Sequence, residues 1–409
     1  MRLLAFVCVA LAVGAGCGGD DDPAGPGTDG GGGGTDSGPA TDGGGPGTDG
    51  SMPGTDSGPL RIDAGPCGPD PTLERGAPID APDGEWTFID FPDSRCMNDT
   101  PTGIGIRPSA TSNDVMIYME GGGACFDFVS CFGVAHAGGF DAGDMASLAA
   151  SSGDQGIFNR ADPDNPVAEW NMVFIPYCTG DVHAGNNPDG FGGRTQVGYA
   201  NVGEYLERLV PTFEGADQVL LTGSSAGGFG AAYNFDRVQR AFGCTPVTLL
   251  DDAGPPMADT YMKPCLQQWW RELWNLNDTL PADCTACTND DGGGMVNFSA
   301  YLAAKYPDRR FGLLSTMEDS VIRTFFGYGY SPSCRSPDNM RAADFRAGLL
   351  DLRENVLGPY PRFLTFFAEG DSHTFLGRPL SDVTVGGTTL AAWIRQLVEA
   401  DPAWSSVGP

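Results

Sequence analysis

Six short apolar segments recur along the chain, and each ends in a turn rich in glycine or in acidic residues. They lie at 115–119, 173–175, 219–222, 247–250, 311–314 and 363–367. Near-continuous apolarity is typical of strands covered on both faces, as in a mostly parallel sheet. Helical patterns follow at 229–242, 339–357 and 389–400. The pattern predicts an α/β fold with a mostly parallel central sheet flanked by helices.

The N-terminal segment differs from the rest. Residues 1–17 begin with one arginine, followed by an apolar run at 3–13 of the length of a signal-peptide core. Small residues before Cys17 resemble a bacterial lipobox, although Gly14 stands where such signals usually carry leucine. We therefore predict a signal peptide that ends at a lipid-modified Cys17, with ordinary secretion as the alternative.

Residues 18–66 repeat a loose Gly-Thr-Asp theme and contain nine aspartates and one arginine. Almost nothing in this stretch can be buried, and glycine increases the entropy cost of ordering. The composition predicts a flexible acidic tether. Residues 67–409 have apolar runs and spaced cysteines, and they are numerous enough for one large core.

Charge and hydropathy limit the kinds of partner that the chain can bind. The chain has 23 Lys+Arg against 53 Asp+Glu, a net charge of −30, and no basic stripe for a nucleic acid. A hydrophobic fraction of 41% excludes a wholly disordered chain. No stretch reaches 18 apolar residues, so membrane contact is expected only through a lipid on Cys17. We expect an exported protein, facing the periplasm or the cell exterior.

Ten cysteines lie in the segment 67–409, and an even count in an exported chain indicates up to five disulfides. The short interval from Cys125 to Cys131 favours a local bridge, whereas the other pairings stay open. Cys284 and Cys287 have the spacing of half a zinc site. No second such pair or nearby histidine completes four ligands, so no metal site is predicted.

The segment 223–227 reads Gly-Ser-Ser-Ala-Gly and follows a predicted strand. It fits the G-x-S-x-G nucleophile elbow, where neighbours two residues from the serine must be small in a sharp strand-to-helix turn. Ser225 is therefore the candidate nucleophile. Ser224 has the wrong offset, because Ala226 follows two residues later.

A serine nucleophile needs a base and an acid, which follow it in the order acid, histidine in α/β-hydrolases. His373 is the one histidine after Ser225, so it is the candidate base. Asp319 follows the second predicted strand after the elbow and is the favoured acid. The alternatives are Glu318 and the pair Asp251 and Asp252. The acid would hold the histidine tautomer and stabilise the imidazolium.

An oxyanion hole needs backbone N–H donors where negative charge develops. One donor should be Ala226, after the nucleophile, and the glycine turn after the strand at 115–119 should supply Gly122 and Gly123. A phosphate-binding loop is the rival interpretation. It is disfavoured because the turn lacks the Gly-Lys-Ser/Thr ending.

Four other residues have less certain roles. Trp269 and Trp270 share a helical face with Leu266, Leu273 and Trp274, which favours a core position over a substrate platform. Glu120 either orders the glycine turn or makes a buried structural pair. His136 has no visible partner in the sequence.

At these residues the sequence resembles the pectin acetylesterase family, which includes the animal Notum carboxylesterases. The shared motifs are Tyr118–Cys125 with Cys131, Ile175–Asp181, Gly223–Gly228, Met317–Ser320, and Ser372 with His373. Ser224 stands where the family has a cysteine, a change that should not affect the chemistry. His183 lies near the expected pocket, where plant members and Notum carry other residues, so the resemblance does not carry over the family's acyl or leaving group.

The resemblance implies an α/β-hydrolase that deacylates esters with no metal or organic cofactor. It carries Ser225, Asp319 and His373 over as the triad, and Gly122, Gly123 and Ala226 as oxyanion donors. His183, Trp269 and Trp270 are the expected substrate contacts. An acylated, chiefly acetylated, polysaccharide is the expected substrate. The alternatives are a lipid or polyester esterase, and a carbohydrate-binding surface lipoprotein with a vestigial triad.

Overall fold

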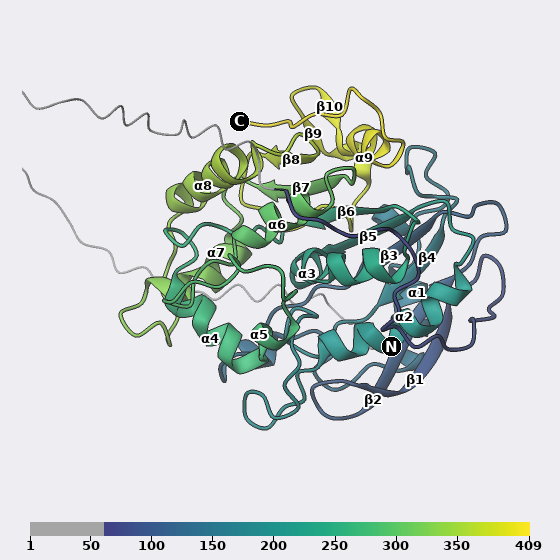
Figure 1. The fold of residues 1–409 in the computed structure, drawn as a ribbon, viewed down its shortest axis with the longest axis horizontal. Coiled ribbons are helices and arrows are strands. Elements are labelled where there is room, and N and C mark those ends of the chain that lie inside the picture. The colour runs from purple at the N-terminus through teal and green to yellow at the C-terminus, as the bar shows by residue number, and fades with distance from the viewer. Residues whose placement is uncertain (1–60) are drawn as a thin grey trace, which may run out of the picture. The chain divides into compact units, whose positions relative to one another are not determined.

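The computed structural model describes residues 61–409, so the predicted signal peptide, Cys17 and most of the predicted tether lie outside it. A sheet of eight strands has the order β1-β2-β4-β3-β5-β6-β7-β8 (Figure 1). Strands β3 to β8 are parallel, and β1 and β2 are antiparallel at one edge. The strands are β1 (Thr87–Arg95), β2 (Pro101–Arg107), β3 (Val115–Met119), β4 (Asn171–Ile175), β5 (Val219–Ser224), β6 (Val247–Asp252), β7 (Phe311–Thr316) and β8 (Phe363–Ala368), with a hairpin of β9 (Thr384–Val385) and β10 (Thr388–Thr389).

All six predicted strands are confirmed, and five extend one or two residues beyond the predicted bounds. The α/β-hydrolase-like class is confirmed with them. Strands β1 and β2 were not predicted. The side chains of β1 are mostly half-buried or exposed, since it is an edge strand, and glycines interrupt the apolar pattern of β2.

Helices connect the strands and cover both faces of the sheet (Figure 1). The predicted segment 339–357 forms α8 followed by one π-helical turn, η4. The helices are α1 (Ala142–Ser151), α2 (Gly198–Thr212), α3 (Ala226–Ala241), α4 (Pro264–Trp274), α5 (Leu276–Thr279), α6 (Asn297–Lys305), α7 (Ser320–Gly327), α8 (Ala342–Asp351), η4 (Leu352–Leu357) and α9 (Leu390–Val398), with 3₁₀ turns η1 (Ser130–Gly133), η2 (Gly156–Phe158), η3 (Tyr328–Tyr330) and η5 (Leu380–Asp382).

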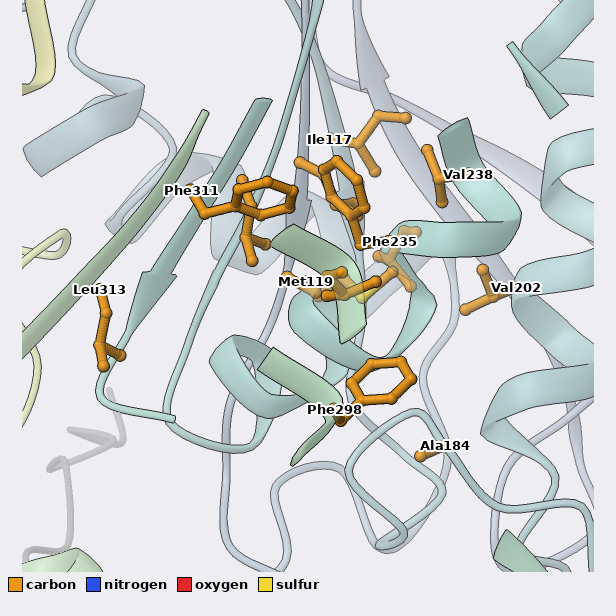
Figure 2. Close-up of a cluster of buried hydrophobic side chains, with 14 of the residues drawn as sticks. Ile117, Met119, Ala184, Val202, Phe235, Val238, Phe298, Phe311 and Leu313 are labelled. Carbon is orange, nitrogen blue, oxygen red and sulfur yellow. The ribbon is translucent and has the colours of Figure 1, made fainter. Parts of the chain in front are cut away.

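Alternate residues of the parallel strands enter two separate cores. Ile117 and Met119 of β3 pack with Phe235 of α3 in the larger core, part of which is drawn in Figure 2. Met116 of the same strand joins the smaller core, where Trp393 of α9 lies. Because successive side chains point to opposite faces of a strand, this division explains the apolar runs in the sequence.

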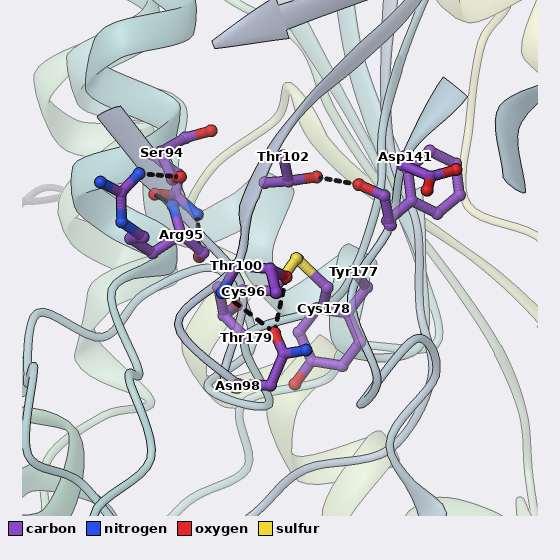
Figure 3. The surroundings of a disulfide bond; sticks show 12 residues. Ser94, Arg95, Cys96, Asn98, Thr100, Thr102, Asp141, Tyr177, Cys178 and Thr179 are labelled. Carbon is purple, nitrogen blue, oxygen red and sulfur yellow. Dashed lines mark hydrogen bonds between the residues drawn. A yellow bond between two sulfur atoms is a disulfide. The ribbon is translucent and has the colours of Figure 1, made fainter. Parts of the chain in front are cut away.

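Five disulfides join the ten cysteines of this segment, which confirms the predicted disulfide-stapled domain and the local Cys125–Cys131 bridge. The other pairs are Cys67–Cys244, Cys96–Cys178, Cys265–Cys334 and Cys284–Cys287. Figure 3 shows Cys96–Cys178, which ties the segment after β1 to the turn after β4. None of the helices within 61–409 is long and apolar enough to cross a membrane.

Candidate active site

Ser225 occupies the sharp turn between β5 and α3, with φ 59° and ψ −123°. A side chain larger than hydrogen is not accommodated at Gly227, since a Cβ there would lie 1.9 Å from the carbonyl oxygen of Met119. This strained turn and the close approach of its glycine are the features that a nucleophile elbow requires. Ser225 therefore projects from the carboxyl end of a central strand.

Asp319 and His373 meet at the same edge of the sheet, after β7 and β8. Nδ1 of His373 lies 2.7 Å from Oδ2 of Asp319, whose side chain is fully buried. Oδ1 of Asp319 accepts the N–H groups of Val321 and Ile322, both at 2.9 Å, and so caps α7. Nε2 of His373 is buried and has no hydrogen-bond partner within 61–409. That nitrogen can therefore accept a proton from a neighbouring group.

The loops that carry these two residues are hydrogen-bonded along their length. The N–H of Glu318 donates to the carbonyl of Gly370 at 2.9 Å, and the N–H of Ser320 donates to that of Asp371 at 3.0 Å. The hydroxyl of Thr316 donates to the carbonyl of Ser372 at 2.6 Å. These bonds hold the acid and the imidazole in a fixed relation.

The two alternative aspartates at the end of β6 have other partners. Oδ2 of Asp252 accepts the N–H groups of Phe375 and Leu376 at 2.9 and 3.0 Å. Its backbone carbonyl accepts the N–H of Ser225 at 2.7 Å. Asp251 accepts the N–H of Gly254 at 2.8 Å, and burial raises the pKa of both carboxyls. Asp252 thus contacts both the elbow and the loop of His373.

The glycine turn after β3 lies against the elbow. A Cβ on Gly121 would be 2.1 Å from the carbonyl oxygen of Ser224 and 2.9 Å from Cβ of Ser225. The amides of Gly122, Gly123 and Ala226 donate to no acceptor among the described residues. Unpaired N–H groups beside a serine can bind an oxyanion.

Glu120 and His136, whose roles the sequence left open, form a pair next to this turn. Oε1 of Glu120 lies 3.1 Å from Nε2 of His136, and Oε2 accepts the N–H of Tyr177 at 2.9 Å. Burial alone would lower the pKa of His136, but the hydrogen bond and charge of Glu120 outweigh it and raise that pKa. No local pattern indicates this pair, because Glu120 and His136 are 16 residues apart and share no helical spacing.

His183 differs from its predicted place. It is 2% exposed and is not part of the cavity wall. Its Nε2 lies 2.8 Å from the carbonyl oxygen of Glu120, which fixes this nitrogen as the hydrogen-bond donor. Burial lowers the pKa of the ring to about 4. This corrects the expected substrate contact, because the ring is a buried support of the glycine turn.

An apolar cavity opens beside Ser225. The space in it that the centres of water-sized molecules can occupy is about 110 Å³. Helices α3, α4, α6 and α7 supply half of the residues in its wall, among them Phe229, Tyr233, Trp270, Trp274, Phe298 and Phe326. Such a wall suits an apolar group better than a sugar.

Trp269 and Trp270 lie on different sides of that wall. Trp270 lines the cavity. Trp269 is 7% exposed, packs against Phe126 and Tyr328, and is covered by the guanidinium of Arg335, so its expected role as a substrate contact is corrected to a core position.

Two observations concern the cysteines that have the spacing of half a zinc site. Cys284 and Cys287 form a disulfide with each other. The described residues include no cluster of three or more His, Cys, Asp or Glu side chains that could hold a metal ion.

Comparison with known proteins identifies related esterases. The mouse palmitoleoyl-protein carboxylesterase NOTUM is 31% identical over 262 residues, which are 59% of this chain and 46% of that protein. The Xenopus laevis palmitoleoyl-protein carboxylesterase notum2 is 34% identical over 157 residues, 35% of this chain and 30% of that protein. The chain thus spans less than half the length of these two relatives.

A zebrafish relative, named inactive palmitoleoyl-protein carboxylesterase notum1b, is 31% identical over 102 residues, 23% of this chain and 67% of that protein. The family model for pectinacetylesterase matches residues 83–321. That match includes the glycine turn, Ser225 and Asp319, and it ends before His373. It covers more than half of the sequence, and the chain therefore belongs to the pectinacetylesterase family.

Proposed function

We propose that the protein is a serine carboxylesterase in which Ser225, Asp319 and His373 act as the catalytic triad. The observation that carries the proposal is the 2.7 Å contact between Asp319 and His373, which leaves the buried Nε2 without a partner. Asp252 contacts the elbow and the histidine loop, which supports placing Ser225 near that nitrogen.

The reaction follows from these positions. Oγ of Ser225 attacks the ester carbonyl carbon while Nε2 of His373 takes its proton. The amides of Gly122, Gly123 and Ala226 donate to the oxyanion. The tetrahedral intermediate collapses as the C–O bond breaks, and the leaving alcohol takes the proton from Nε2. A water molecule then repeats the sequence on the acyl-enzyme, and Asp319 stabilises the imidazolium in both halves.

The apolar cavity next to Ser225 favours a medium or long acyl chain. It therefore shifts the proposal from the acetylated polysaccharide that we expected toward a lipid-like or polyester substrate. The mouse relative is named for a palmitoleoyl ester, which agrees with an apolar acyl site. An acetylated polysaccharide is the second candidate, and the family's name supports it.

The proposed location is outside the cytoplasm. Five disulfides in one domain suit an oxidising compartment. We also propose that the segment 1–17 directs export and that Cys17 carries a lipid. Labelling of Cys17 with a radioactive fatty acid tests the lipid modification.

Hydrolysis of p-nitrophenyl acetate and octanoate by wild type, Ser225→Ala and Ser224→Cys tests the activity. We expect Ser225→Ala to lose at least about 10³-fold in kcat on both esters. Ser224→Cys, which restores the family's residue, should stay close to wild type. If neither ester shows turnover that depends on Ser225, the result favours the alternative of a binding protein with a vestigial triad; the zebrafish relative is itself named inactive.

A further inference from the structure

The largest exposed apolar side chains gather beside the candidate active site. Within 61–409, four large hydrophobic residues are exposed: Phe128 (70%), Phe132 (73%), Val129 (58%) and Val321 (36%). Three of them, Phe128, Val129 and Phe132, lie in the loop after the glycine turn. Val321 lies in the first turn of α7, next to Asp319. We call the three loop residues the apolar rim. Scattered single hydrophobic residues need no explanation, but a grouped set marks an interaction site.

The loop of the apolar rim is held in shape. The Cys125–Cys131 disulfide closes it, and Oγ of Ser130 accepts the N–H groups of Phe126 and Asp127 at 3.1 and 2.9 Å. The N–H of Ser130 donates to Oδ1 of Asp127 at 2.6 Å. The rings of Phe128 and Phe132 pack edge to face, 4.9 Å between centroids, on the outside of this loop. A disulfide and several hydrogen bonds therefore hold the loop in a shape that leaves these side chains exposed to water.

The loop of the apolar rim continues into the cavity wall. Phe126 lies between the exposed tip and the cavity, with ring centroids 5.7 Å from Trp270 and 6.2 Å from Phe325, two cavity residues. Val321 precedes Phe325 by four residues on α7, so both lie on one helix face. The base of the loop and α7 therefore make apolar contacts at the wall of the cavity that Ser225 lines.

We propose that the apolar rim docks on the surface of aggregated ester lipid, such as a membrane, micelle or droplet, and that an acyl chain enters the cavity from there. Binding stands on the exposed residues alone, whereas delivery of an ester to Ser225 rests on the proposed function. The three loop side chains offer roughly 400 Å² of apolar surface. That is about half of what a stable protein interface buries on each partner, yet it is enough to insert into a lipid surface.

Charge selects the kind of lipid surface. The segment 124–134 contains Asp127 and no Lys or Arg, and the whole chain carries a net charge of −30. An anionic membrane would repel it. The rim therefore suits a zwitterionic or neutral surface, and binding should vary little with salt.

The test is co-sedimentation of the full chain with phosphatidylcholine vesicles, in a Cys17→Ser background so that no N-terminal lipid contributes. We expect wild type to bind and the double variant Phe128→Ser/Phe132→Ser to bind at least about tenfold more weakly. The matched control Phe128→Leu/Phe132→Leu keeps the apolar surface and should bind like wild type. Adding Ser225→Ala should leave binding unchanged, which separates this proposal from the proposed function.

Turnover of dissolved p-nitrophenyl acetate checks that the serine variant is folded, and we expect it to stay within about twofold of wild type because neither phenylalanine touches the reacting groups. Equal vesicle binding by wild type and the serine variant would overturn the proposal, as would no binding by wild type. Sedimentation of wild type as a dimer and of the serine variant as a monomer would also overturn it, because a second copy would then cover the rim.

Discussion

The hydroxyl of Ser224 donates to Oδ2 of Asp252 at 2.7 Å, and the same oxygen accepts the backbone of Phe375 and Leu376. The residue before the candidate nucleophile is thereby joined to the loop that begins just after the candidate base. Asp252 is fully buried, so its carboxyl group is part of the framework between the two loops that carry Ser225 and His373. It is a positioning residue, because it reaches the chemistry through the elbow and the histidine loop.

Substitution of Asp252 by asparagine tests this role. The amide places an NH₂ donor where Oδ1 now lies, 3.1 Å from the N–H of Phe375. Its neutral oxygen also accepts the three donors that now share Oδ2 more weakly than a carboxylate does. We expect kcat on p-nitrophenyl octanoate to fall about 10- to 100-fold with KM nearly unchanged, since small displacements of reacting groups lower the rate of the chemical step. Asp251→Asn is the matched control, because Asp251 is equally buried and does not contact the histidine loop. Equal losses in both variants would show a general packing effect.

Asp319 contacts His373 and also caps α7, and two variants separate these roles. Asp319→Asn should reduce kcat about 10³- to 10⁴-fold, because an amide cannot stabilise the imidazolium of His373. It should leave the free energy of unfolding nearly unchanged, since asparagine is also a good N-cap for α7. Asp319→Ala should lose activity and about 1 kcal/mol of stability, measured by urea denaturation. Near-wild-type kcat in Asp319→Asn would exclude Asp319 as the acid.

The sequence predicted the parts of the fold whose signal is local. The strands of the parallel sheet are apolar on both faces and stand out, and the elbow at Gly223–Gly227 has a fixed spacing. Edge strand β1 has a mixed pattern, because half of its surface faces solvent. The type of an element could be predicted where consecutive residues share one environment, as in strands that are buried on both faces.

The supports of the site were less accessible, because they depend on contacts between distant segments. The family resemblance placed His183 near the pocket, and its neighbours Val182 and Ala184 do line the cavity. Its own ring points to the carbonyl of Glu120, 63 residues earlier in the chain. Periodicity carries no information on such a contact. The same holds for Asp252, which sequence order ranked only as an alternative acid.

The cavity makes a prediction on acyl-chain length. Ala232 of α3 lines it, and Ala232→Phe would fill part of the space with a ring. We expect kcat/KM for p-nitrophenyl octanoate to fall at least about tenfold, because each excluded methylene loses about 0.8 kcal/mol of transfer free energy. The acetate ester serves as the internal control and should change less than about threefold. A parallel loss on both esters would mean that the cavity does not hold the acyl chain.

The two buried or half-buried histidines behind the glycine turn should give opposite dependences of stability on pH. In the folded protein burial lowers the pKa of His183 from 6.5 to about 4, so the unfolded chain binds more protons between these values. Its contribution to stability is therefore present above pH 6.5 and is lost as the pH falls toward 4. The loss from pH 7 to pH 5 should be about 2 kcal/mol. Burial raises the pKa of Asp181 to about 6, which acts in the opposite direction in part of the same range.

Urea denaturation of wild type, His183→Gln and His136→Gln at pH 5 and pH 7 isolates these terms, because Asp181 is common to all three proteins. His183→Gln keeps a donor for the carbonyl of Glu120 and should lose less stability than wild type on going from pH 7 to pH 5. His136→Gln should lose more, because the raised pKa of His136 beside Glu120 makes a contribution that is present at low pH and is lost as the pH rises. Equal pH dependence in wild type and His183→Gln would mean that the His183 ring becomes charged inside the fold, and its role as a neutral support of the oxyanion turn would have to be abandoned.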